Sequence, residues 1–375
     1  MEFKIEKILI DRTQNISFIT IKEDAEFNLK GYNIPKNGLE VPILNEDLVD
    51  VVKNDEQGIK ISSIIKGILN ILGIDSKFKY NEEYKKILYL YDEKIEDYIG
   101  FKALEYAKDR KFLKGLIYLK ALLYLNPNNL NGLYNYCVVC IDLLKMYSKA
   151  KDEEKENLFF EEALEKLEYI VSKHPDFALS YYNLGFLYLK NQQYIKAKLN
   201  WEDAVAKGLD DDKKVEVLNE LNDLEYKVEY EEGYNLVING HPKEGLEKLE
   251  PLLKDYSDWW NLIFFVGLAK RQLNELDQAI YYFEKILTAN ENQTDTLCEI
   301  ALCYASKMDL EASLEYFSRA LANRPNDYEI LCNIGMIYLQ MNEVKKAKEY
   351  IDYAYELNPN DQITLSCKRE IEKYI

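Results

Sequence analysis

A spacing of 34 residues recurs along the chain and limits what it can fold into. Counting back from Gly335 in steps of 34 reaches Ala301, Gly267 and Gly233, all small residues. The large residues do the same, because Ile351 falls on aromatic or aliphatic side chains at this spacing. A fixed period of this length is typical of stacked supersecondary units, each unable to bury its apolar face alone. We therefore expect an extended array of repeats.

Residues 328–361 show the pattern most clearly, with a small residue in each half and a proline near the end. The positions concerned are Leu331, Ile334, Gly335, Tyr338, Ala347, Ile351, Ala354 and Pro359. This pattern resembles the tetratricopeptide repeat. The resemblance implies a mainly α fold, a right-handed α-solenoid of about seven helix hairpins. The repeats are 96–129, 130–177, 178–211, 226–259, 260–293, 294–327 and 328–361.

Two extra stretches of 14 residues interrupt the array on either side of repeat 178–211. The first lies inside repeat 130–177, at the tip of its hairpin, and we expect it to lengthen both helices. The second is residues 212–225, where Val215, Leu218 and Leu221 recur every three residues. This spacing favours an inserted helix that continues into the first helix of the next repeat.

Residues 1–95 do not fit the repeat, and we expect them to form a small N-terminal α+β cap. Phe3–Arg12 and Ile16–Lys22 are rich in β-branched and aromatic residues, which favours a β-hairpin, and the glycines and prolines of 31–42 favour irregular structure. Helical periodicity predicts helices over 46–53, 62–72 and 82–95, the last two paired as a degenerate hairpin. Residues 362–375 are predicted to form a helix that caps the other end.

The net charge of −18 disfavours nucleic acid and anionic membranes as partners, and favours a basic or apolar peptide segment. No stretch approaches the ~18 apolar residues that a membrane helix needs. The first residues are charged and alternating, unlike a secretory signal, so we expect a cytoplasmic protein. The abundance of Tyr, Ile, Lys and Asn hints at a bacterial source.

No catalytic, metal or cofactor motif occurs in the sequence. Cys137 and Cys140 have the spacing of half a zinc site, but both occupy core positions of a repeat and no second pair follows. The two histidines, His174 and His241, each precede a proline at a turn. We therefore expect no enzyme activity, no metal and no cofactor.

The resemblance implies a concave surface lined by the first helix of each repeat. The candidate peptide-binding residues at those positions are Phe101, Tyr134, Asn135, Tyr182, Asn183, Phe186, Lys190, Tyr230, Tyr234, Phe264, Phe265, Glu299, Asn333 and Met336. An asparagine amide can bond a peptide backbone in both directions, and aromatic rings supply contact area at low entropic cost. Some of these rings could equally pack between helices.

The sequence thus predicts a non-catalytic scaffold or adaptor that holds a peptide segment of a partner protein. One alternative is a receptor for a signalling peptide with an effector domain at its N-terminus. A less favoured alternative is an enzyme whose chemistry lies in residues 1–95. The partner's identity, the oligomeric state and self-occupancy of the groove stay open.

Overall fold

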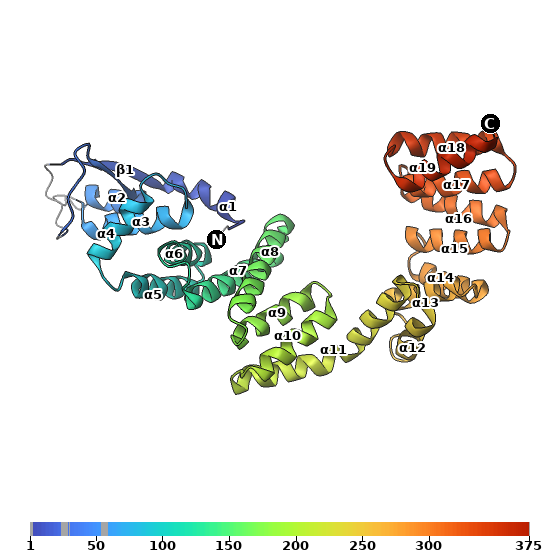
Figure 1. The fold of residues 1–375 in the computed structure, drawn as a ribbon, viewed down its shortest axis with the longest axis horizontal. Coiled ribbons are helices and arrows are strands. Elements are labelled where there is room, and N and C mark those ends of the chain that lie inside the picture. Colours follow the sequence, from blue (N-terminus) through green and yellow to red (C-terminus); the bar gives the residue numbers. More distant parts are fainter. Residues whose placement is uncertain (1–2, 24–28, 30, 54–58, 375) are drawn as a thin grey trace. The chain divides into compact units, whose positions relative to one another are not determined.

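The computed structural model describes residues 3–23, 29, 31–53 and 59–374 (Figure 1). Among these residues the secondary structure is helical apart from one two-stranded sheet. The chain divides into two compact parts, which we call module 1 (Met1–Gln192 with Lys196–Leu218) and module 2 (Gln193–Ile195 with Asn219–Ile375). The predicted mainly α array of helix hairpins with a small strand-containing cap is confirmed.

The β-sheet of module 1 differs from the predicted hairpin. Helix α1 (Glu6–Ile10) and the 3-10 turn η1 (Asp11–Asn15) take the place of the first strand. Strand β1 (Ile16–Ile21) pairs antiparallel with β2 (Leu39–Leu44), so its partner lies in the stretch that we expected to be irregular. Tertiary packing explains the difference, because Val41 and Ile43 of β2 are buried and β2 contacts the third helix of the cap.

Three further helices complete the cap: α2 (Asn45–Lys53), α3 (Ile61–Ile74) and α4 (Asn81–Tyr91). The predictions for 46–53 and 62–72 are confirmed, whereas the predicted helix 82–95 ends at Tyr91. Helix α3 does not pair mainly with α4, as we expected, but crosses α6 (Phe112–Leu125). The crossing is close enough that a Cβ atom on Gly73 would lie 2.0 Å from the carbonyl oxygen of Ile117.

The repeats of module 1 form helix hairpins of unequal length. They comprise α5 (Ile95–Lys108), α6, α7 (Leu130–Ala150), α8 (Glu153–Lys173), α9 (Ala178–Lys190) and α10 (Tyr194–Ala206). Helices α7 and α8 have 21 residues each, against 14 each in α5 and α6, which confirms that the first insertion lengthens both arms. Lys151 turns the chain with φ 58°, and the side chain of Asp152 caps α8 by accepting from the N–H of Lys155.

Helix α11 (Asp211–Ile238) runs without a break for 28 residues and contributes to both modules. The prediction that 212–225 continues as one helix into the next repeat is therefore confirmed. Module 2 then contains α12 (Pro242–Leu252), α13 (Trp260–Gln272), α14 (Leu276–Ala289), α15 (Thr294–Ser306), α16 (Leu310–Asn323), α17 (Tyr328–Gln340), α18 (Val344–Leu357), α19 (Gln362–Ile371) and the short turn η2 (Glu372–Tyr374).

The core of module 2 follows the repeat positions. A Cβ atom on Gly267 would lie 2.8 Å from the ring of Phe283, and one on Gly335 would lie 2.6 Å from the side chain of Ile351. Small residues are thus placed where a large side chain of the next helix arrives. Ile371 of α19 packs beside Ile351 in the buried cluster of the last repeat. None of the described helices is both long and apolar enough to cross a membrane.

Polar residues that intrude into the repeat positions of module 2 are paired. Glu232 of α11 accepts from Lys248 at 2.7 Å, and Lys270 of α13 lies 2.9 Å from Glu250 and 3.2 Å from Glu275. Because these ion pairs are at least partly open to solvent, each contributes little to stability. Ion pairing thus lets repeats 226–259 and 260–293 carry charged residues at these positions.

Candidate functional site

A pocket of about 380 Å³ opens in module 1 between α7, α9 and the beginning of α11. Its lining combines apolar side chains, two aromatic rings and several lysines. The lining residues are Ile141, Leu144, Lys145, Ser148, Lys149, Tyr182, Asn183, Phe186, Leu187, Lys190 and Glu216. Four of the residues predicted from the sequence, Tyr182, Asn183, Phe186 and Lys190, are brought together here.

The aromatic wall of the pocket is held in place by its neighbours on α9 and α10. The rings of Tyr182 and Phe186 meet edge to face at 5.1 Å, and Phe186 meets Trp201 in the same way at 4.9 Å. Trp201 in turn donates its indole N–H to the carbonyl oxygen of Tyr182 at 3.2 Å. Gly185 makes room for this ring, since a Cβ atom there would lie 2.2 Å from the indole nitrogen. The wall is therefore preorganised.

The hydroxyl of Tyr182 joins α9 to α11 by donating to Glu216 at 2.7 Å. Burial and this acidic acceptor raise the pKa of Tyr182, so the phenol keeps its proton and remains a donor. The position of the Tyr182 ring thus depends on a residue of the inserted helix.

Asn183 forms the polar part of the same wall. Its side-chain nitrogen donates to the hydroxyl of Tyr134 at 3.0 Å and to the carbonyl oxygen of Leu179 at 3.0 Å. Tyr134 is itself fixed edge to face against Phe177, at 5.2 Å between ring centroids. Because both bonds use the nitrogen, the carbonyl oxygen is what Asn183 can offer to a ligand. From the sequence we expected the Asn183 amide both to donate to and to accept from a peptide backbone. In the structure only its accepting oxygen is available for this.

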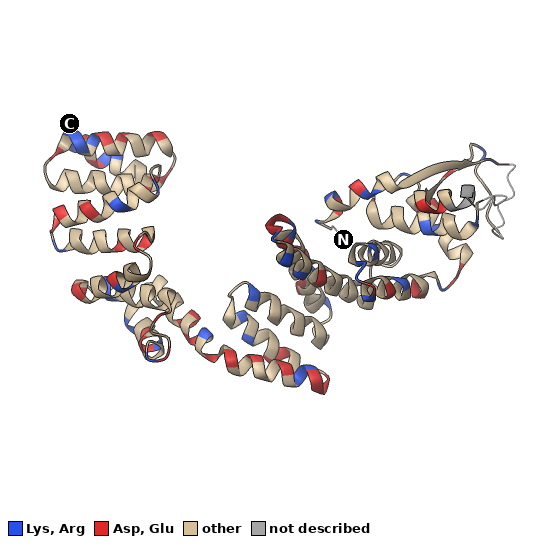
Figure 2. Ribbon diagram, turned by 180° about the vertical axis from the view of Figure 1, so that it is seen from behind, with Lys and Arg blue, Asp and Glu red and all other residues tan. Residues whose placement is uncertain are grey.

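The lysines give the pocket a charge opposite to that of the chain. Three lysines and one glutamate line it, in a protein with net charge −18. Lys190 is paired with Glu156 of α8 at 2.7 Å, and this contact lowers the pKa of Glu156. By contrast, acidic residues recur along the length of α11 (Figure 2). The lysines Lys145 and Lys149 are both exposed on α7.

Both insertions contribute to the pocket. The first helix of repeat 328–361 ends at its thirteenth residue, Gln340, and the thirteenth residue of repeat 130–177 is Asp142. Leu144, Ser148 and Lys149 therefore lie in the lengthened part of α7, whereas Glu216 lies in the inserted helix.

Sequence reasoning missed these lining residues of the two insertions. It considered only the positions that all repeats share, and the insertions have no counterpart in the other repeats. The signal that could have found them is the placement of the insertions, one on each side of repeat 178–211.

The other predicted residues of module 1 lie outside the pocket lining. Phe101 is 61% exposed on α5, and Asn135 is half-buried on α7. Tyr134 supports Asn183 without being part of the lining itself. Phe101 is therefore an exposed aromatic residue of the same predicted surface that does not line the pocket.

In module 2 the predicted aromatic residues mostly pack on one another. Tyr230 is only 7% exposed and its ring lies 4.3 Å from that of Trp259. Tyr234 stacks on Phe265 at 5.1 Å, and Phe264 packs against Phe283 at 5.6 Å. These rings form part of the core of module 2 and its margin.

The remaining predicted residues lie on α15 and α17. Glu299 is paired with Arg271 of α13 at 2.5 Å, while burial raises the pKa of the Glu299 carboxyl. Asn333 is half-buried, and Met336 packs beside the cluster that includes Ile351.

The described part of the chain offers no candidate metal site. No group of three or more His, Cys, Asp or Glu that could hold a metal ion occurs among the described residues. Cys137 and Cys140 are fully buried in α7, which raises the pKa of both thiols. His174 and His241 are exposed at turns.

Two stretches of the chain match family models, and both models are described as tetratricopeptide repeat. The matches cover residues 328–361 and residues 167–198. No curated protein matches the chain.

Several solved structures are similar to parts of the chain. MamA AMB-1 is 22% identical, with 50% of this chain and 96% of that chain covered and a TM-score of 0.35. YrrB, described as a TPR protein with an unusual peptide-binding site, is 18% identical over 67% of this chain and 97% of its own, with a TM-score of 0.28. A tetratricopeptide repeat protein from Parabacteroides merdae ATCC 43184 is 11% identical over 74% of this chain and 98% of its own, with a TM-score of 0.41.

Proposed function

We propose that this chain, of which two stretches match tetratricopeptide repeat models, is a non-catalytic scaffold that binds a peptide segment of a partner protein in the pocket of α7, α9 and α11. The observation that carries the proposal is the preorganised wall of Tyr182, Asn183 and Phe186. Concave pockets of roughly 300–1,000 Å³ with an apolar lining and a few fixed polar groups are typical binding sites.

The lining indicates the chemistry of the ligand. Phe186, Leu144 and Leu187 offer an apolar surface for one side chain of the peptide. The carbonyl oxygen of Asn183 can accept from a backbone N–H of the peptide.

The lysines favour acidic residues beside the apolar one. From the net charge of the chain we expected a basic or apolar segment. Lys145, Lys149 and Lys190 at this pocket attract carboxylates instead, because local charge acts more strongly than the distant charges that salt screens. The proposed ligand is an apolar residue flanked by Asp or Glu.

The experiment begins with selection of peptides from a random display library on the immobilised full chain. Synthetic versions of the selected peptides are then titrated by fluorescence anisotropy against four proteins. These are the wild type, Phe186→Ala, Lys149→Glu and, as a matched control, Phe101→Ala, which removes an exposed ring outside the pocket.

We expect Phe186→Ala to weaken binding by about tenfold or more, as truncation of a central aromatic contact does. Lys149→Glu should weaken binding mainly for acidic peptides and mainly at low salt. Phe101→Ala should bind like the wild type. Thermal melts check that each variant is folded. Equal affinity of Phe186→Ala and the wild type, or loss of binding with Phe101→Ala alone, would reject this pocket as the site.

A further inference from the structure

Three charged side chains of α6 and α8 are buried in a way that the repeat does not require. Glu162 is 0% exposed, Lys120 is 2% exposed and Lys166 is 3% exposed. The residues at the repeat position of Glu162 in three other repeats are Lys196, Glu244 and Lys346, all exposed. Those at the position of Lys120 are Glu202, Glu250 and Glu284, again all exposed. In repeats 96–129 and 130–177, therefore, another part of the molecule must cover these helix positions.

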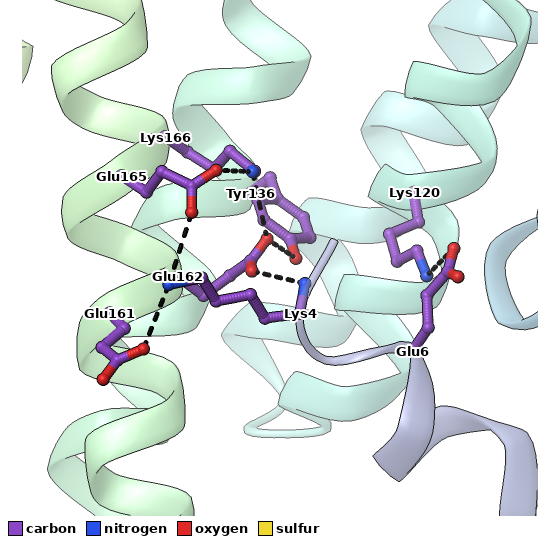
Figure 3. Close-up of polar contacts among 8 residues, drawn as sticks. All are labelled: Lys4, Glu6, Lys120, Tyr136, Glu161, Glu162, Glu165 and Lys166. Atoms are coloured by element: carbon purple, nitrogen blue, oxygen red, sulfur yellow. Dashed lines mark hydrogen bonds and ion pairs between the residues drawn. The ribbon is translucent and has the colours of Figure 1, made fainter. Parts of the chain in front are cut away.

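The cover is a short piece of the same chain, residues 3–6, which we call the 3–6 segment (Figure 3). The backbone N–H of Lys4 donates to Glu162 Oε2 at 2.8 Å. The other carboxylate oxygen of Glu162 accepts from the hydroxyl of Tyr136 at 2.8 Å and lies 4.0 Å from Lys166 Nζ. A buried carboxylate thus receives a peptide N–H in a charge-assisted hydrogen bond, here from the turn that leads into α1.

The ring of Phe3 lies in an aromatic and cationic subsite. It meets Tyr136 edge to face at 5.2 Å. The ammonium groups of Lys120 and Lys166 lie 5.1 Å and 5.6 Å from the ring centroid. Two cations and an aromatic edge around one ring recognise the π face of an aromatic side chain.

The carboxylate of Glu6 fills a third subsite, in which it pairs with Lys120 Nζ at 3.3 Å. The side chain of Lys4 points to the surface of α8, where it lies 3.0 Å from Glu161 and 3.4 Å from Glu165. These contacts are exposed and add little selectivity. The face therefore recognises an aromatic residue, the N–H of the next residue and an acid three positions after the aromatic one.

Space remains along the segment. A cavity of about 690 Å³ is lined by residues of the first helix and the segment before it, and by the first turns of α8. Its lining residues are Phe3, Lys4, Glu6, Lys7, Ile8, Glu154, Lys155, Asn157, Leu158 and Glu161. The contact between the 3–6 segment and α8 is thus made by specific polar groups at one side of an open space.

We propose that this face of α6, α7 and α8 is a second peptide-binding site, occupied here by the chain's own 3–6 segment and able to take a partner segment of the same chemistry in its place. The ligand has an aromatic residue, a variable residue, an aliphatic residue at the position of Ile5, which is 0% exposed, and an acid. The site uses none of the residues that line the pocket of α7, α9 and α11, so it stands independently of the proposed function.

The test uses the full chain and a peptide that copies the segment. The peptide is acetyl-Phe-Lys-Ile-Glu-Lys-amide with a fluorophore on the last side chain. It is titrated by anisotropy against the wild type and against the double variant Phe3→Ala/Glu6→Gln, which empties the aromatic and acidic subsites. Matched control peptides carry Ala in place of Phe, or an N-methyl group on the backbone nitrogen of the first Lys.

The peptide should bind the double variant about tenfold more tightly than the wild type, because the wild-type segment competes for the site. N-methylation should abolish binding, since it removes the N–H that Glu162 accepts. On Lys120→Met added to the double variant, peptides with Glu and with Gln at the fourth position should bind equally. A purely structural tether would not produce this loss of discrimination.

A second measurement covers the case in which the double variant is poorly folded. Hydrogen exchange of the wild type, read at the amide of Lys4, should speed up when the peptide is added in excess. Absence of binding to a folded double variant, indifference to N-methylation, or unchanged exchange at Lys4 in the wild type would each overturn the proposal.

Discussion

Helices α6 and α16 are the second helices of their repeats, yet they are buried to very different extents. In α16 the residues Ser313, Phe317 and Ala320 are buried, all on the one face that packs within the array. In α6 nearly every residue from Gly115 to Leu125 is buried, including Lys120. The difference arises because α3 and the 3–6 segment cover the outer face of α6. A repeat position therefore fixes the inner face of a helix and leaves the outer face to its surroundings.

Substitution of Glu162 should show the largest difference in stability between the covered helix face of module 1 and the exposed helix faces of module 2. Glu162→Ala leaves the N–H of Lys4 and the hydroxyl of Tyr136 without their acceptor. It also removes the buried carboxylate 4.0 Å from Lys166, which keeps its contact with Glu165 at 2.7 Å. Removing one partner of a buried charged pair costs about 3–5 kcal/mol. Glu244→Ala, at the same repeat position but exposed in module 2, should change the free energy of unfolding by less than about 0.5 kcal/mol. Urea unfolding of both variants measures the difference, and equal effects would contradict it.

The crossing of α3 and α6 provides the next comparison. In Gly73→Ala the new Cβ atom would lie 2.0 Å from a backbone oxygen, so two helices must move apart. We expect this overpacking to cost about 3 kcal/mol, near the upper end of the usual range. In Gly335→Ala the Cβ atom would lie 2.6 Å from the side chain of Ile351, which can shift, and about 1 kcal/mol is expected.

Thermal and urea unfolding measure both glycine variants, and hydrogen exchange in α6 reports on the covered face. Faster exchange in α6 should accompany Gly73→Ala only. A larger cost for Gly335→Ala than for Gly73→Ala would show that the α3–α6 crossing is not as close as described.

The last comparison concerns the pH dependence of stability, which a buried thiol of module 2 should affect only at high pH. Burial raises the pKa of Cys303 from an ordinary thiol value of 9.0 to about 11. The unfolded chain therefore loses this proton at a lower pH than the folded chain does. The stability that Cys303 contributes is complete below about pH 9 and is lost as the pH rises to about 11, roughly 2–3 kcal/mol in all.

Urea unfolding of the wild type and of Cys303→Ala, compared across that pH window, measures this contribution. The stability of the wild type should fall more steeply with pH than that of the variant. Parallel curves would show that the thiol titrates alike in both states. In module 1 the pKa values of Cys137 and Cys140 are raised further, so their contribution should continue to fall above about pH 11.

Much of the helical array could be predicted from the sequence, because its determinants are local. The spacing of small and large residues placed the hairpins, and the length of the insertions predicted the extended α7 and α8 and the continuous α11. The candidate site was predicted in part. Tyr182, Asn183, Phe186 and Lys190 share a pocket, whereas Tyr230 is buried among other rings. Whether a residue on the first helix of a repeat is accessible to a ligand depends on which neighbouring helices pack over it. The 34-residue spacing carries no information about those contacts.

The amino-acid sequence by itself determined the repeat, the helices and their inner faces, since a 34-residue period and a helical apolar stripe are both local patterns along the chain. Only the tertiary structure decided the partner of β1, the meeting of two insertions at one pocket and the burial of Lys120, Glu162 and Lys166. In the sequence these three charges are typical of a solvated helix face. Contacts across more than 100 residues, such as that between Lys4 and Glu162, bury them beneath the 3–6 segment.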